Sequence, residues 1–132
     1  MQLPVVLLFG YSSEKRLDRI INNAIRMESA GNSRRKIDSL IINRRAETIP
    51  DKVRKAMNLA VLAPSKKNQQ PWRLRIRKDG LDLGYLHQRQ LDLGIFMAHL
   101  KIALDHFGIH FRTELSNEKS NDVEWCIKIF WK

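Results

Sequence analysis

The sequence predicts an α+β domain, because both helical and strand periodicities occur in it. Apolar residues recur at helical spacing in residues 12–26 and 92–106. Residues 73–77 and 81–86 flank a Lys-Asp-Gly turn, which is typical of a β-hairpin. Residues 125–132 alternate in the manner of a strand. Helices and strands mixed in this order favour an α+β or α/β domain.

Capping residues and chain breakers set the expected ends of the helices. Thr48 is a suitable N-cap, and Pro50 is tolerated in a first turn. That helix is expected to end before Pro64, because a residue that precedes proline is pushed out of the helical region. Asp92 is the expected cap of the last helix, and Gly108 is its expected stop.

The other segments are interpreted from their polarity. Residues 4–10 form an apolar run that predicts a buried strand, and they lack the basic start and cleavage site of a secretory signal. Residues 114–122 are polar and are interpreted as a loop. In the C-terminal strand, Trp125 and Trp131 are expected on one face, packed into a core.

Length and composition indicate one domain, residues 1–132, of a folded protein. The chain has 132 residues of which 43% are apolar, too many for a disordered chain. Mean hydropathy is −0.39 and no apolar run approaches ~18 residues, so no membrane span is expected. Cys126 is the one cysteine, which excludes an intrachain disulfide and suits a cytoplasmic location.

The charge balance points to anionic partners. Lys and Arg number 24 against 14 acidic residues, a formal net charge of +10. Such an excess favours nucleic acid or ligands that carry phosphate. A nucleic-acid-binding module therefore stays open as an alternative function, although a basic surface without a binding role is also common.

Common catalytic patterns are missing from the sequence. It contains no Walker A, GxGxxG or HExxH motif. The four histidines lack nearby cysteines or a carboxylate cluster, so no metal site is expected, and His99 is interpreted as a packing or hydrogen-bonding residue. Cys126 has no identifiable histidine–acid partner and is interpreted as a small structural residue. No protein side chain is therefore predicted to be catalytic.

Two polar segments are candidates for ligand binding. Residues 33–36 read Ser-Arg-Arg-Lys, which is either a solvated turn or a phosphate clamp, since arginine matches phosphate oxygens. Residues 63–72 form a loop stiffened by two prolines. In this loop Ser65, Asn68 and Gln70 can read the edge of a flat heterocycle, and Trp72 is expected to anchor the loop to the core.

The loop resembles a motif of the nitroreductase family of flavin-dependent oxidoreductases. That family carries Ala-Pro-Ser-x-x-Asn-x-Gln-Pro-Trp after a helix, and residues 63–72 match it without a gap. Residues 91–100 look like the helix that follows in the family. Residues 4–11 with residues 33–36 look like the second half of a duplicated nitroreductase-like subfamily, in which one chain holds two such halves. The resemblance implies a nitroreductase-like fold, a small mixed sheet with packed helices, of which this chain is one half.

The resemblance also implies a flavin site and an oxidoreductase activity. FMN would accept electrons from NAD(P)H and pass them to a nitro or quinone acceptor, so the flavin would carry the chemistry. The resemblance implies that the two candidate segments bind FMN, through the residues Arg34, Arg35, Lys36, Pro64, Ser65, Asn68 and Gln70.

A homodimer is the assembly that the resemblance implies, because flavin sites in the family lie between two halves. The stripe Phe96, Met97, Leu100 and Leu104 is the expected interface. The alternative is that this stripe fills the core of a monomer.

Overall fold

A computed structural model of the chain describes residues 33–43, 49–87 and 89–131. The expected strand at residues 4–10, the expected helix at residues 12–26 and the Thr48 cap lie outside these described residues. Within the described ranges, no helix has the length and apolar character needed to cross a membrane.

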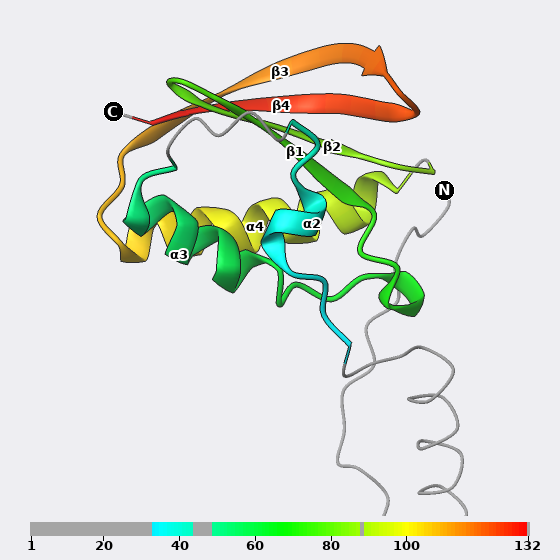
Figure 1. Cartoon of the computed structure of the whole chain (residues 1–132), viewed down its shortest axis with the longest axis horizontal. Helices are drawn as coiled ribbons and strands as arrows, with labels where there is room; N and C mark the ends of the chain where they lie inside the picture. The colour runs from blue at the N-terminus through cyan, green and yellow to red at the C-terminus, as the bar shows by residue number, and fades with distance from the viewer. Residues whose placement is uncertain (1–32, 44–48, 88, 132) are drawn as a thin grey trace, which may run out of the picture.

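The described chain forms a four-stranded sheet with helices against one of its faces (Figure 1). Neighbouring strands are antiparallel in the order β1-β2-β4-β3, and one parallel bridge joins Ile41 to Leu74. The α+β prediction is therefore confirmed. The elements are α2 (Ile37–Leu40), α3 (Asp51–Ala60), the 3-10 turn η1 (Lys66–Asn68), β1 (Trp72–Arg77), β2 (Gly80–Tyr85), α4 (Gln90–His106), β3 (Phe111–Ser120) and β4 (Val123–Trp131).

The β1–β2 hairpin and the end of α4 follow the predictions. Arg77 pairs with Gly80 around a turn at Lys78 and Asp79. A Cβ added to Gly80 would lie 1.9 Å from the Ile129 carbonyl oxygen, so only glycine fits there. Gly108 has φ +68 and follows α4, which is the left-handed stop that glycine favours.

The apolar stripe of α4 lies in the core and is not an interface. Phe96, Leu100 and Leu104 are each at most 1% exposed and belong to the main hydrophobic cluster between the helices and the sheet. Met97 is half-buried against the same cluster. The expectation that this stripe contacts a second copy is wrong, because these side chains are already covered within one chain.

The polar segment at residues 114–122 is a strand for most of its length and not a loop. β3 is an edge strand with mostly exposed side chains, so it has no apolar alternation by which the sequence could reveal it. The sequence feature that could have revealed β3 is the pair Asn121 and Asp122. These two residues, with φ values of +49 and +63, form the tight turn into β4. Asn and Asp are the residues that tolerate such a turn best after glycine.

A register shift places Trp125 and Trp131 on opposite faces of the sheet. Leu83 pairs with Ile127 but Gly84 pairs with Trp125, so Cys126 is an extra residue in β4. Trp131 packs against the helix-side core, while Trp125 lies under the Arg75 guanidinium on the outer face. A Cβ on Gly84 would lie 2.7 Å from the Glu124 carbonyl oxygen and 3.0 Å from the Trp125 ring, so glycine is required where β2 passes this part of β4.

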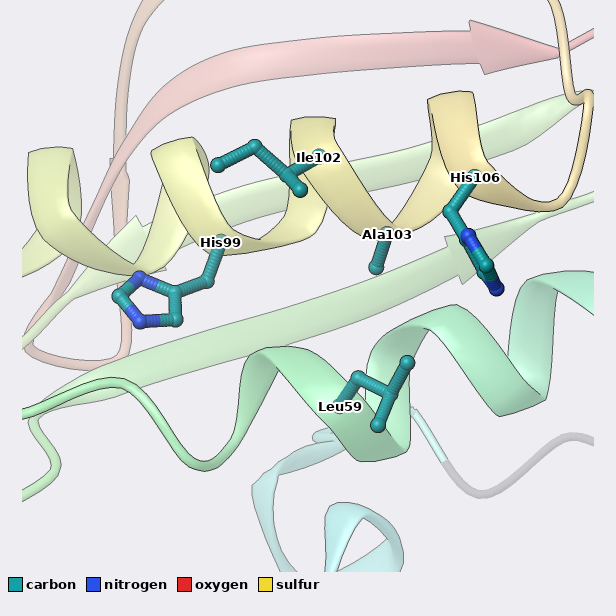
Figure 2. Close-up of a pocket in the computed structure, with 5 residues that line it drawn as sticks. All are labelled: Leu59, His99, Ile102, Ala103 and His106. Atoms are coloured by element: carbon teal, nitrogen blue, oxygen red, sulfur yellow. The ribbon is translucent and has the colours of Figure 1, made fainter.

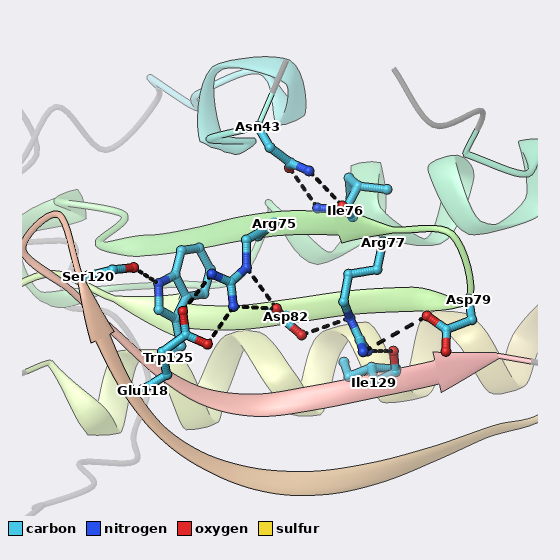
Figure 3. A network of polar contacts seen from close by, with 10 residues as sticks. All are labelled: Asn43, Arg75, Ile76, Arg77, Asp79, Asp82, Glu118, Ser120, Trp125 and Ile129. Carbon is cyan, nitrogen blue, oxygen red and sulfur yellow. Dashed lines mark hydrogen bonds and ion pairs between the residues drawn. The ribbon is translucent and has the colours of Figure 1, made fainter. Parts of the chain in front are cut away.

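The outer face of the sheet is held by a buried carboxylate between two arginines (Figure 3). Asp82 is 2% exposed; one of its oxygens lies 2.7 Å from Arg75 Nη2 and the other 2.9 Å from Arg77 Nε. Arg75 also pairs with Glu118 of β3 and lowers the pKa of that carboxyl. The guanidinium of Arg77 stacks on Phe130. These contacts join all four strands.

Replacing Asp82 by alanine should destabilise the protein by about 3 kcal/mol, because two guanidinium groups would lose their buried partner. The matched control is Asp79→Ala, which removes an exposed carboxylate 3.9 Å from Arg77 and should cost less than about 1 kcal/mol. Urea unfolding of both variants measures the difference. Equal losses in the two variants would show that Asp82 has no special role.

Tyr85 has a perturbed phenol at the end of β2. Its side chain is 3% exposed, and its hydroxyl donates a hydrogen bond to Glu124 Oε2 at 2.5 Å. Burial and this hydrogen bond raise the pKa of Tyr85 to about 12. The unfolded chain would lose this proton near pH 10, its ordinary value, so the protonated phenol stabilises the fold below that pH.

This stabilisation should be lost as pH rises from about 10 to about 12. The Tyr85→Phe variant lacks the titrating group, so its stability should fall less steeply than that of the unmodified chain over this range. Urea unfolding at several pH values measures both slopes. In parallel, the ultraviolet titration should lose its component near pH 12 in the variant, and an unchanged titration would contradict the assignment.

Candidate cofactor site

The structure brings the two candidate segments together. Residues 33–36 lie directly before α2, and residues 63–72 run from the end of α3 through η1 to β1. The side chains of Asn68 and Gln70 in the loop contact the backbone or side chains of Ser33, Arg34 and Arg35. These five residues are called the polar cluster below. Segments more than thirty positions apart thus form one site within a single chain.

The Gln70 amide is the centre of the polar cluster. Gln70 is 3% exposed, its Oε1 accepts the Arg35 backbone N–H at 2.8 Å, and its Nε2 donates to the Ser33 carbonyl at 3.1 Å. Asn68 Nδ2 donates to the same carbonyl at 2.6 Å, and Asn68 Oδ1 accepts from Arg34 Nη1 at 2.5 Å. Both amides therefore hold the basic segment against the loop.

The loop carries unusual backbone geometry. Lys67, Asn68 and Gln70 have φ values of +49, +52 and +49, a left-handed region that lysine and glutamine rarely adopt. The Ser65 hydroxyl accepts the Gln70 backbone N–H at 2.9 Å and so helps to hold this conformation. Strained residues of this kind gather at ligand sites, where the surrounding structure maintains them.

Two buried side chains anchor the ends of the loop. Trp72 is fully buried, which confirms its predicted role as an anchor in the core, and its ring stacks on Phe96 of α4 at 4.8 Å. Asp92 is not the cap of α4, because the helix begins at Gln90 and Arg89 is its N-cap. Asp92 is instead 5% exposed, and its Oδ1 accepts the Lys66 backbone N–H at 3.1 Å. The predicted capping role of Asp92 is therefore wrong, and its contact with the loop was not predicted.

Arg73 joins the site although sequence reasoning did not select it. Its Nη1 donates to the carbonyls of Trp72 and Gln70, which turns the guanidinium back toward the loop. Burial and the nearby positive charge of Arg35 lower the pKa of Arg73. Among the described residues, no carboxylate forms an ion pair with Arg34, Arg35 or Arg73. Cations gathered without an acidic partner are suited to an anionic ligand.

The remaining predicted site residues lie at the rim. Pro64 is exposed, and Ser65 is half-buried beside the polar cluster. Lys36 is exposed at the start of α2; its carbonyl accepts hydrogen bonds from Ser39, and its side chain makes no hydrogen bond or ion pair with described residues. The signal that could have found Arg73 is its position directly after the motif.

A separate hollow lies between α3 and α4 (Figure 2). It has a volume of about 350 Å³ and a largely apolar lining. His99 lines it and has Nδ1 2.9 Å from the Ile95 carbonyl, so the predicted hydrogen-bonding role is confirmed. No residue of the polar cluster contributes to this hollow. Its lining consists of Leu59, His99, Ile102, Ala103 and His106.

Replacing Gln70 by alanine should destabilise the fold by about 2 kcal/mol, because the Arg35 N–H and the Ser33 carbonyl would lose their partner. The control is Gln69→Ala, which changes the neighbouring exposed amide and should leave stability within about 0.5 kcal/mol. Thermal and urea unfolding measure both. If the two variants unfold alike, the Gln70 amide does not hold the segments together.

Comparisons with known proteins agree with the motif. The model of a family described as "Putative TM nitroreductase" matches residues 1–104. Among solved structures, the chain is similar to a protein from Thermotoga maritima described as a putative nitroreductase, with 25% sequence identity and a TM-score of 0.56. That similarity covers 74% of this chain and 42% of the solved chain. No curated protein matches the sequence.

Proposed function

The chain belongs to the nitroreductase family whose model covers residues 1–104, and from this membership we propose that it binds FMN at the polar cluster. The observation that carries the proposal is the meeting of Arg34 and Arg35 with Asn68 and Gln70 in one chain. The match covers 42% of the solved relative's chain. The enzymatic activity of a full-length family member is therefore assigned to this chain as a proposal.

The chemistry of the polar cluster suits a flavin nucleotide. Arg34, Arg35 and Arg73 supply guanidinium groups without carboxylate partners among the described residues, which fits a phosphate. The Asn68 and Gln70 amides and the Ser65 hydroxyl suit the polar edge of a flat ring. We assign Lys36 and Pro64 to the rim of the same site.

We propose that the protein is an NAD(P)H-dependent oxidoreductase of the nitroreductase type. Bound FMN would supply the electron transfer to a nitro or quinone acceptor. The protein's part would be to hold the phosphate with the basic segment and to orient the ring with the loop. The anchors Trp72 and Asp92 keep the loop in place for that task. No described side chain is assigned an acid–base role.

A homodimer of single 1–132 domains in the cytoplasm completes the proposal. The family resemblance supports the dimer, but the buried stripe of α4 does not form its interface. Because the basic segment and the loop meet within one chain, each copy has its own polar cluster. Sedimentation equilibrium of the purified chain, with and without FMN, tests the assembly. A mass near 15.5 kDa under both conditions would contradict a dimer.

The nucleic-acid alternative rests on net charge alone. The outer sheet face does not offer a stacking surface at Trp125, because this indole is 3% exposed and covered by Arg75. Several cations of that face are paired with acidic residues. Binding of DNA or RNA that weakens steeply with salt would nevertheless favour this alternative over the flavin.

The purified protein should take up FMN and show the visible absorption of oxidised flavin. Arg35→Ala should weaken FMN binding about tenfold by removing a charge-assisted contact, and it should leave riboflavin binding unchanged, because riboflavin lacks the phosphate. The variant keeps the backbone N–H that binds Gln70. Fluorescence titration with both flavins measures the two affinities.

The matched control is Lys101→Ala, which removes one positive charge from the exposed face of α4 and should alter neither affinity. An unmodified chain that takes up no FMN would overturn the proposed function. If Arg35→Ala weakens FMN and riboflavin binding equally, Arg35 does not contact the FMN phosphate.

A further inference from the structure

The two edges of the sheet differ in how they are covered. Along β1, Ile42 donates its N–H to the Leu74 carbonyl at 2.9 Å, and the Asn43 amide makes two hydrogen bonds to the Ile76 backbone (Figure 3). These contacts close the β1 edge. β3 forms the other edge, and no described segment pairs with its outer side (Figure 1). Among the described residues this ten-residue edge is unpaired, and an unpaired strand edge is a template for another strand.

β3 also exposes an apolar side chain at its middle. Leu115 is 90% exposed, the highest value among the exposed large hydrophobic residues of the described chain. It lies opposite Ile127 of β4, whose side chain packs against the helix-side core. Arg112 and Glu118 lie on the outer face, where they contact Phe130 and Arg75 respectively. The two faces of β3 therefore present different chemistry to an incoming strand.

We propose that β3 pairs antiparallel with β3 of a second copy, with Leu115 opposite Leu115 on the two-fold axis. A two-fold axis perpendicular to a sheet leaves each side chain on its own face, and opposed residues of antiparallel strands share a face. One residue must therefore lie opposite its own copy. With Leu115 in that place, Arg112 lies opposite Glu118 of the second copy, and this favourable pair occurs twice.

The neighbouring registers bring like charges together. Centring the pair on Glu114 places that carboxylate opposite its own copy, and centring it on Ser116 places Glu114 opposite Glu118. Like charges directly opposed across strands are destabilising. Charged residues on an edge strand usually prevent pairing, but here their order favours the Leu115 register over the two registers centred on its immediate neighbours.

The α3–α4 hollow is a weaker candidate for the contact between copies. Its lining is apolar, but nothing in the structure shows what covers it. The β3 edge, in contrast, identifies a second copy as the occupant and favours the Leu115 register over its two neighbours. The inference rests on the proposed homodimer only for the existence of two copies and does not depend on flavin binding.

Cysteine cross-linking tests the register in the full chain. In a Cys126→Ser background, Leu115→Cys should form a disulfide-linked dimer on mild oxidation, because directly opposed Cβ atoms lie about 5 Å apart. The control Asn117→Cys points to the same face, but its copy would lie about 13 Å away along the strand, so it should stay monomeric. Cross-linking of neither variant, or of both equally, would overturn the proposal.

Sedimentation of Leu115→Glu gives the second measurement. The substitution places two carboxylates at the axis and should raise the dimer dissociation constant about tenfold or more. Its melting temperature measured under conditions where the chain is monomeric should not change, because the side chain is exposed. An unchanged dissociation constant would place the contact between copies elsewhere, while FMN uptake by the same variant tests the proposed function separately.

Discussion

The burial of Trp72 is the constraint on which the candidate site depends. Its indole is fully covered, stacks on Phe96 of α4 and begins β1 opposite Tyr85. A large aromatic group held in this way ties the loop to the helix layer and the sheet at once. Gln70 lies two residues before Trp72, and Arg73 follows it directly. The buried indole therefore fixes the backbone position of both residues. A displacement of Trp72 would disrupt the packing of the hydrophobic core, because the indole itself packs within that core.

The amide side chains of the polar cluster form hydrogen bonds with other residues of the same cluster. The amides of Asn68 and Gln70 form hydrogen bonds with Ser33, Arg34 and Arg35. A ligand at this site would therefore bind beside these bonds or exchange some of them. In either case the guanidinium groups are already gathered, which lowers the cost of ordering them around an anion. The strained backbone of the loop is supported by a further hydrogen bond, from the Gln70 backbone N–H to the Ser65 hydroxyl.

Local patterns were sufficient to predict the β1–β2 hairpin and the helices α3 and α4, but not the parts determined by long-range contacts. Apolar periodicity located α4, and the turn residues located β1 and β2. β3 was missed because its exposed faces carry no alternation, and only the Asn121-Asp122 turn marks it. The motif and the basic segment supplied the candidate residues, and the structure brings Arg34 and Arg35 into contact with Asn68 and Gln70. The partner of Asp92 depends on the folded loop and has no sequence signal, and Arg73 is marked only by its position directly after the motif.

The one-sided packing of the sheet accounts for the different character of its two faces. The helices cover the face that carries Leu74 and Ile129, so those positions are apolar and buried. No described helix covers the opposite face, and there the arginines of β1 must find partners within the sheet. Asp82 provides them with a buried carboxylate, and Trp125 gives Arg75 an aromatic surface. Because this network ends at Glu118 on β3, the charges that order the outer face are also those that an approaching strand would meet.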